Sequence, residues 1–503
     1  MPESIDVPVE PEVFRRLDRA RFLRLLGAGA GLSMLPTSLA FLAGPAGAQA
    51  AASGLPISGE DYPIGIWWPP PPELPPDPPD KTREEYYAEI MAAGFNFVIG
   101  GNGVVNDAHN PPALQAASAN GLMFLLTDAR LRNLIRDGGG ATQTSSLEKS
   151  TPSVMQSILG RPGPKLRTAA VSDDDVKQRV QELVANYGGH PALAGINLYD
   201  EPKASMFGLV NTARTELQTS APDELPYVNV WPSYAAAGAL GTRDYRTYLE
   251  RFFTGVNPPL LCFDHYPLLK KGITSDYFYN WAMIRTFALD FGVPSWGFVQ
   301  SVGFDGSDVG LADRRRPNRQ EILWQVNVGL AYGAKGIQYF TYWTPEAQPA
   351  PSIRFGQAMI STTGQPTVLY DYVREVNTYL KVVGKVLLPL FSESVVHARE
   401  RRMPMGAKPF RGDRYVRDVS GSPVILGRFR DAGTSARYML VVNRSFANRA
   451  RTRLTMGGAV SRVSKLNIST GVFDKVRLQG RPRRDLVSTI QPGGARLYLL
   501  QNA

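Results

Sequence analysis

Short apolar segments alternate with helix-forming segments eight times between Tyr62 and Val386, and this alternation restricts the fold more than any other feature of the chain. The segments that we predict as strands are Tyr62–Trp68, Phe95–Ile99, Leu122–Thr127, Gly195–Pro202, Tyr227–Trp231, Leu260–Phe263, Ser295–Gln300 and Gly336–Tyr342. A strand that is followed by a helix and a second strand forms a right-handed crossover, which places the two strands in parallel. Eight such units predict an α/β fold of the (β/α)8 TIM-barrel type, to which we assign residues 55–392.

The texture of the sequence changes after Leu390. Short strand candidates, separated by Gly, Pro and Asn turns, occur at Tyr438–Val442, Arg453–Met456, Lys465–Ile468 and Arg496–Leu500. This pattern predicts a small C-terminal antiparallel β-sandwich, to which we assign residues 393–503.

Two stretches of the barrel region predict long loops. The proline-rich segment 69–80 cannot form a helix or a strand ladder, so we expect a rigid, polyproline-like loop. Residues 137–170 are rich in Gly, Ser and Thr, and loops of that length inside a domain usually have a function or lack order. We expect both segments to shape a cleft.

Residues 1–50 have the pattern of an export signal. Basic residues between Arg15 and Arg24 precede an apolar run, and Ala48-Gln49-Ala50 has the form of a cleavage site. The stretch DRARFLRLLGAGAGL is similar to a twin-arginine signal, except that Ala20 separates Arg19 from Arg21. We expect a periplasmic or extracellular protein that begins near residue 51; a segment that is not cleaved would instead anchor the chain to the membrane.

The net charge of +10 is concentrated at the C-terminal end of the chain. Residues 395–503 carry 22 basic and 6 acidic side chains, whereas residues 51–394 carry 28 basic and 34 acidic ones. This excess favours contact with an anionic envelope polymer, and a solvated, arginine-rich exterior is the alternative. No recognised reader motif accompanies the charge, so we expect no nucleic-acid partner. The oligomeric state is not indicated.

Cysteine and histidine are scarce in this chain. The single cysteine, Cys262, excludes an intrachain disulfide, and its apolar neighbours predict a buried, unreactive thiol. The four histidines are widely scattered, so we expect neither a histidine-based metal site nor a cofactor.

The segment GINLYDEP, residues 195–202, is the most informative single stretch for chemistry. It predicts a short strand that ends in two carboxylates, Asp200 and Glu201, because Pro202 has no N–H with which to continue a central ladder. Acidic side chains at the carboxyl ends of the strands are where (β/α)8 barrels hold their catalytic groups. An ordinary Asp-Glu-Pro turn is the alternative interpretation.

Several motifs together resemble the clan A glycoside hydrolases, and the pattern is most similar to the family-42 β-galactosidase branch. They are LYDEP, the DHYP motif after the sixth strand and LAYGAKGIQYFTYWTP around the eighth. The C-terminal VVNRSF, LNISTG and IQPGGARLYLL resemble the small β-sandwich that follows the barrel in many glycosidases. The resemblance implies that Glu201 is the general acid/base of a glycosidase. Such a group needs a pKa raised by burial or by a nearby like charge, and Asp200 is placed to supply the charge.

The resemblance also implies a carbohydrate-binding cleft. Trp343 would form an apolar floor for one face of a sugar, and Tyr266 would donate a hydrogen bond beside it; a position in the barrel-rim core is the alternative for Trp343. The other residues that we expect to line the cleft are His265, Gln300, Asn102, Trp231 and Tyr199.

The seventh strand departs from the family pattern. The nucleophile of clan A is a glutamate at the end of this strand, whereas this chain has Val299 and Gln300 there. The N-acetyl group of the substrate would then attack, with Asp200 steadying the intermediate. Alternatively, Asp264, or as second choice Asp305, would act as nucleophile or base, at about 5–5.5 Å from the acid for retention or about 6.5–9.5 Å for inversion.

Three classes of function follow. The first is a secreted glycoside hydrolase that acts on an oligo- or polysaccharide. The second is a barrel that binds carbohydrate without cleaving it, and the third is a structural protein attached to the cell envelope. Two carboxylates together in an aromatic-lined site would favour the first class.

Overall fold

The computed structural model describes residues 57, 61–76, 81–139, 171–347, 352–434, 436–480 and 484–502. The predicted export signal, residues 140–170 of the predicted long loop and residues 77–80 of the proline-rich segment lie outside the described residues. No helix of the described ranges is both long enough and apolar enough to span a membrane.

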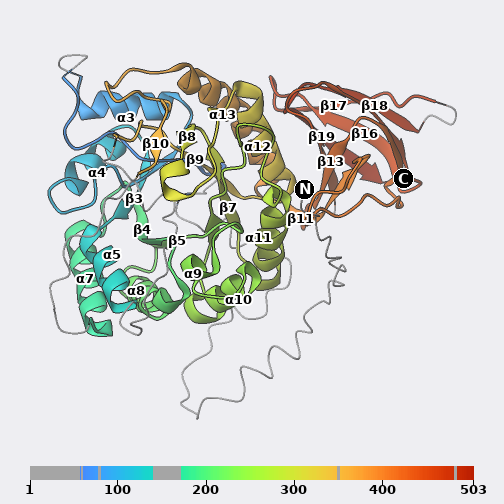
Figure 1. Cartoon of the computed structure of the whole chain (residues 1–503). Coiled ribbons are helices and arrows are strands. Elements are labelled where there is room, and N and C mark those ends of the chain that lie inside the picture. Colours follow the sequence, from blue (N-terminus) through green and yellow to red (C-terminus); the bar gives the residue numbers. More distant parts are fainter. Residues whose placement is uncertain are drawn as a thin grey trace, which may run out of the picture. The chain divides into compact units, whose positions relative to one another are not determined.

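Eight parallel strands close into a barrel, as the sequence predicts, and helices surround it (Figure 1). The strands are β1 Ile64–Trp67, β2 Phe97–Ile99, β3 Met123–Thr127, β4 Leu193–Asp200, β5 Leu225–Val230, β6 Leu261–Phe263, β7 Ser295–Gln300 and β9 Gly336–Phe340. They pair in chain order, and β9 closes the ring on β1 through Ile64–Ile337 and its neighbours. The carboxyl ends of all eight strands therefore meet at one mouth.

Several of the helices between the strands begin at residues whose side chains cap them. The larger helices are α3 Arg83–Ala92, α4 Asn110–Ala119, α5 Ala129–Gly139, α7 Asp173–Tyr187, α8 Phe207–Ser220, α10 Tyr245–Val256, α11 Tyr277–Phe291, α12 Arg319–Ala331 and α13 Val368–Leu387. Thr82, Ser172 and Asn318 each form a capping box with an acidic residue three positions later. These reciprocal bonds satisfy backbone N–H groups that the first helical turn leaves open.

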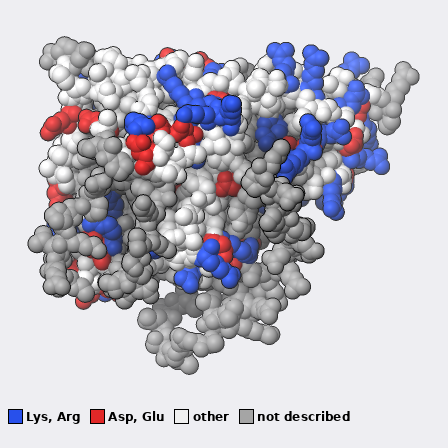
Figure 2. Space-filling model, in the orientation of Figure 1, with Lys and Arg blue, Asp and Glu red and all other residues white. Residues whose placement is uncertain are grey.

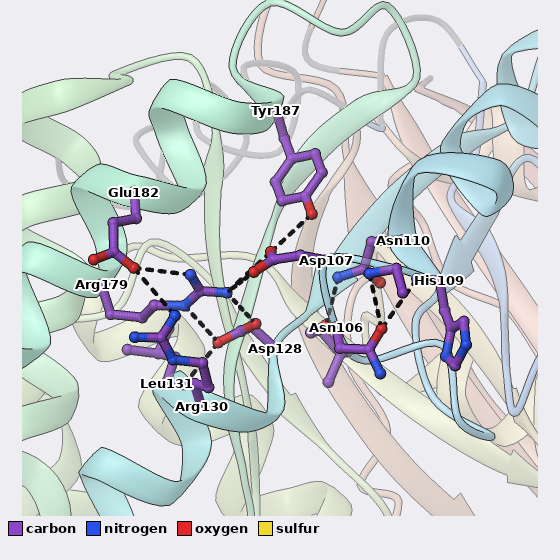
Figure 3. A network of polar contacts seen from close by, with 12 residues as sticks. Asn106, Asp107, His109, Asn110, Asp128, Arg130, Leu131, Arg179, Glu182 and Tyr187 are labelled. Atoms are coloured by element: carbon purple, nitrogen blue, oxygen red, sulfur yellow. Dashed lines mark hydrogen bonds and ion pairs between the residues drawn. The ribbon is translucent and has the colours of Figure 1, made fainter.

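Helix α5 corrects one expectation, since residues 137–139, which the sequence analysis assigned to a long loop, form its last turn. Asp128 accepts the backbone N–H of Leu131 at 2.7 Å and so begins the helix. The buried side chains of Leu131 and Ile135, four residues apart, hold it against the barrel. Asp128 also accepts two hydrogen bonds from the guanidinium of Arg179, which lies in α7 (Figure 3).

The C-terminal residues form two antiparallel sheets, which confirms the predicted β-sandwich. One sheet has the order β11-β13-β14-β19-β16-β17 and the other β12-β15-β18. Their strands are β11 Phe391–Ala398, β12 Val416–Gly421, β13 Val424–Arg430, β14 Arg437–Asn443, β15 Ala450–Met456, β16 Val460–Leu466, β17 Phe473–Lys475, β18 Asp485–Ile490 and β19 Ala495–Asn502. Lys and Arg side chains gather over these sheets on the face in Figure 2.

Polar and aromatic side chains fill the barrel interior below the mouth. The hydroxyl of Tyr227 in β5 donates to Oε1 of Gln338 in β9 at 2.9 Å and lies 3.0 Å from Sγ of Cys262 in β6. Cys262 is fully buried, as predicted, and burial raises the pKa of its thiol. The interior is thus a packed, hydrogen-bonded core on which the mouth rests.

Candidate active site

Glu201 has an unusual backbone conformation directly after β4. Its φ is +54°, in the left-handed region, which costs a non-glycine residue about 1–2 kcal/mol. The backbone N–H of Glu201 donates to the carbonyl oxygen of Asn229 at 2.8 Å, and this bond holds the conformation. The register between β4 and β5 also shifts between Asn197 and Tyr199. The bulge and the turn are the means by which adjacent residues 200 and 201 both reach the mouth.

Three acidic residues meet at this position. Asp200 ends β4, Glu201 follows it, and Asp264 follows β6; their exposed fractions are 8%, 3% and 1%. The amide nitrogen of Asn229 in β5 donates to Oδ1 of Asp200 at 3.1 Å and to Oδ1 of Asp264 at 3.1 Å. Glu201 also acts on Asp264 and lowers the pKa of its carboxyl group. The structure therefore brings together all three residues that the sequence analysis proposed as catalytic.

Burial and mutual repulsion change the acidity of this cluster. Burial, and then the charge of Asp264, raise the pKa of Asp200 to about 8, although Asn229 and Arg132 of α5 act in the opposite direction. Burial raises the pKa of Asp264 to about 6, and the hydrogen bond from Asn229, together with the nearby side chains of Tyr266 and Glu201, limits this rise. The hydrogen bond to Asp264 favours its ionised form. Near neutral pH the cluster therefore holds both ionised and protonated carboxyl groups.

Two tyrosines lie beside the cluster. The charges of Asp264 and Glu201 help burial to raise the pKa of both Tyr266 and Tyr234. Tyr266 is fully buried, and its carbonyl oxygen accepts a hydrogen bond from Nε of Arg314 at 2.5 Å. The guanidinium of Arg314 lies 5.6 Å from the ring centre of Tyr234. Both phenols are neutral at physiological pH and are suited to hydrogen bonding with hydroxyl groups.

Sequence reasoning missed Asn229, Tyr234 and Arg314. Asn229 carried a usable signal, because it is the polar residue in an otherwise apolar strand, YVNVW. On a strand, residue 229 shares its side with Tyr227, whose hydroxyl is inside the barrel. Tyr234 and Arg314 lie in loops, where the sequence contains no periodicity that indicates which way a side chain points.

The remaining predicted cleft residues contact other parts of the protein. Both ring nitrogens of His265 are engaged, by Asn280 at 2.8 Å and Thr274 at 2.7 Å, and burial lowers its pKa to about 4. The side chain of Gln300 accepts the N–H of Leu268 at 2.9 Å and donates to the carbonyl of Arg315 at 2.9 Å. These two side chains support the loops around the mouth.

Four further predicted residues have diverse surroundings. Trp343 is 2% exposed and packs edge-on against Tyr86, with ring centres 5.2 Å apart. Asn102 donates to the carbonyl of Pro69 at 2.7 Å. Tyr199 is buried, with Arg132 of α5 near its hydroxyl. The indole N–H of Trp231 is buried and has no partner among the described residues, so it is a donor suited to a ligand.

Asp305 lies apart from the cluster. It belongs to β8, Phe304–Asp305, where hydrogen bonds from Ser307 and then the ion pair with Arg354 of β10, Arg354–Phe355, lower its pKa. Its side chain is 40% exposed. The second-choice carboxylate is thus committed to a surface ion pair.

Two recesses elsewhere on the described chain contain no carboxylate. One lies at the start of β7 and β9 and is lined by Arg285, Lys335 and Ser392 among others. The other is lined mainly by residues of α13, β16 and β19. Neither includes a residue of the acidic cluster. Within the described ranges, no three His, Cys, Asp or Glu residues are placed to hold a metal ion.

Comparisons with known proteins yield matches of fold only. No family model matches the chain, and no curated protein matches it. A solved glycoside hydrolase is 13% identical, covers 88% of this chain and 96% of its own, and has a TM-score of 0.48. The β-L-arabinopyranosidase of Geobacillus stearothermophilus is 11% identical over 90% and 99%, with a TM-score of 0.45. The α-amylase of Geobacillus thermoleovorans is 10% identical over 88% and 98%, with a TM-score of 0.46.

Proposed function

We propose that this chain is a glycoside hydrolase in which Glu201 is the general acid/base. The observation that carries the proposal is the burial of Asp200, Glu201 and Asp264 in one cluster at the barrel mouth. Burying several carboxyl groups together reduces the free energy of unfolding, and such clusters with raised pKa values are typical of catalytic sites. The resemblance of the sequence motifs to clan A supports the same assignment, including the family-42 branch.

The arrangement suits Glu201 to proton donation. Glu201 lowers the pKa of Asp264 and so favours the ionised form of that carboxyl group. In this proposal Glu201 carries the proton. Glu201 can transfer this proton to the glycosidic oxygen as the bond to the leaving group breaks. Asp264 then stabilises the proton when it returns to Glu201.

The second chemical role falls to Asp200 in this proposal. Asp264 accepts a hydrogen bond from Asn229, and Glu201 further favours its ionised form. Asp200, by contrast, has a buried Oδ2 without a partner among the described residues. This oxygen can receive a substrate group, which favours attack by the substrate's own 2-acetamido group, with Asp200 orienting it.

The test is a comparison of aryl 2-acetamido hexosides with aryl hexosides as substrates. Glu201→Gln keeps the volume of the side chain and should lower kcat/KM by about 10²–10⁴-fold while sugar binding persists. Glu224→Gln is the matched control, because burial raises the pKa of Glu224 to about 7 but this residue precedes β5 at the other end of the barrel. Asp200→Asn should be nearly as damaging on acetamido substrates.

Three outcomes decide between the function classes. Equal cleavage by the wild type and Glu201→Gln would overturn the assignment of Glu201. Cleavage of neutral hexosides, with Asp264→Asn more damaging than Asp200→Asn, would replace substrate assistance by a two-carboxylate mechanism. Sugar binding without any cleavage would make the chain a carbohydrate-binding barrel.

We also propose that the protein is exported and that its basic C-terminal region contacts an anionic envelope polymer. This proposal rests on the export-signal pattern of residues 1–50 and on the excess of basic side chains in residues 395–503. N-terminal sequencing of the exported protein should begin near residue 51. A soluble exported chain that still begins at Met1 would contradict cleavage.

A further inference from the structure

We infer that Asn229 is a positioning residue that holds Asp200, Glu201 and Asp264 together at the barrel mouth. The inference rests on the proposed function for its chemical meaning, but the placement of Asn229 stands independently of it. Asn229 belongs to β5, the strand between the two that end in the acidic residues. It is 1% exposed.

Asn229 contacts each member of the cluster with a different group or hydrogen. Its backbone carbonyl accepts the N–H of Glu201 at 2.8 Å, which fixes the left-handed turn of residue 201. Its side-chain nitrogen has two hydrogens and donates to Asp200 and to Asp264, at 3.1 Å in both cases. One residue thereby sets the relative positions of three carboxyl groups that come from two strands.

The chemistry of an amide explains why the residue is asparagine. An aspartate would add a fourth carboxyl group in place of the donor, and a leucine of similar size would donate no hydrogen bond. The side-chain oxygen of Asn229 is buried and lacks a partner among the described residues. A buried acceptor without a hydrogen bond destabilises the fold, so packing alone does not explain an asparagine at this position. The hydrogen bonds that its side-chain nitrogen donates to the two aspartates do explain it.

Charged and titratable groups face the cluster from several elements. Asp200 and Glu201 come from the end of β4, Asp264 and Tyr266 from the segment after β6, and Tyr234 from the segment after β5. Arg132 of α5 acts on Asp200. Arg314 acts on Tyr234 and on His265, which is next to Asp264 in the chain. Asn229 is the neutral donor that the two aspartates share.

The experiment compares Asn229→Leu with Asn197→Leu. Asn197 is a matched control because it is a buried asparagine of β4 whose nitrogen donates to Thr127 at 3.2 Å and whose oxygen also has no partner among the described residues. The protonated-carboxyl band of the infrared spectrum is titrated in the full protein. Loss of the shared donor should raise the apparent pKa values of the cluster by about one unit or more, whereas Asn197→Leu should leave them unchanged.

Activity supplies a second readout. In Asn229→Leu the acidic limb of the kcat/KM profile should move upward by the same amount as the infrared titration. Asn229→Ser, which keeps one donor, should give a smaller shift and replaces Asn229→Leu if that variant fails to fold. A titration identical to that of the wild type would overturn the inference. A shifted titration in a protein that cleaves no glycoside would retain the positioning role and reject the proposed function.

Discussion

The carboxyl groups of Asp200 and Asp264 approach the same amide nitrogen, each with its Oδ1 at 3.1 Å. These two oxygens are therefore no more than about 6 Å apart, a separation at which buried carboxyl groups oppose each other's ionisation. The pair titrates as a unit, with pKa values raised to about 8 for Asp200 and about 6 for Asp264. This relationship joins residues that are 64 positions apart in the sequence and leads to the first prediction.

Asp200→Asn should remove a pH dependence of stability. Between pH 6.5 and 8, Asp200 is protonated in the folded state and ionised in the unfolded state, so stability falls as pH rises. The free energy of unfolding of Asp200→Asn, minus that of the wild type, should therefore increase by about 1.4 kcal/mol per pH unit in this window. Chemical denaturation at several pH values measures the difference between the two curves.

That difference, and not either curve alone, isolates Asp200. Burial lowers the pKa of Lys335 to about 7, and this group acts in the opposite direction above pH 7 in both proteins. Asp305→Asn is the control, because the lowered pKa of Asp305 leaves it ionised in both states throughout the window. Parallel curves for the wild type and Asp200→Asn would contradict the prediction.

Gln300→Glu should fail to restore a strand-seven nucleophile. The amide nitrogen of Gln300 donates to the carbonyl oxygens of Val302, at 3.2 Å, and Arg315, at 2.9 Å. A carboxylate there would face both carbonyls in a fully buried position. We expect a loss of about 3–5 kcal/mol in the free energy of unfolding and no gain in glycoside cleavage. A stable variant with increased activity would show that this side chain is free to face substrate.

Arg179→Met should destabilise the barrel by about 3–5 kcal/mol, measured by urea denaturation. Arg179 and Asp128 are each 2% exposed and are joined at 2.7 Å, so the substitution leaves a buried carboxylate without its cation (Figure 3). Arg130→Met is the control. Arg130 is 65% exposed and lies 3.5 Å from Glu182, so its loss should cost about 1 kcal/mol or less. Equal effects would contradict the role of burial.

Arg401, Arg402 and Arg417 are exposed and lie in the basic C-terminal region. Replacing all three by glutamine should weaken retention of the protein on an anionic polysaccharide column. The effect should diminish above about 0.15 M salt, where the Debye length is about 8 Å. The elution salt concentration is the measurement.

A matched triple variant removes charge from the barrel instead. Lys203, Lys271 and Arg316 are exposed there, and replacing them by glutamine should leave retention nearly unchanged. Equal losses in both variants, or retention that does not depend on salt, would count against a specific role of the C-terminal charge.

The sequence alone was sufficient for the barrel, because local signals fix its elements. Apolar runs of the right length form the strands, and caps such as Thr82 and Ser172 begin the helices. It also placed Asp200 and Glu201 at the end of β4, because Pro202 cannot continue a ladder. Helix α5 escaped prediction because residues from 137 onward were assigned to a long loop, whereas Asp128 begins a helix by accepting the N–H of Leu131.

What the tertiary structure decided is which polar side chains meet. Asn229 and Asp264 are 35 positions apart, and their contact depends on the register of neighbouring strands. Gln300 fits the nucleophile position by sequence, but its amide is used by loops that only the folded chain brings near. The sequence determined the barrel and the strand end that carries the acids, since backbone propensity and hydrophobic burial act locally. The acidic cluster, and the amide that positions it, follow from distances between strands, which the closed barrel sets.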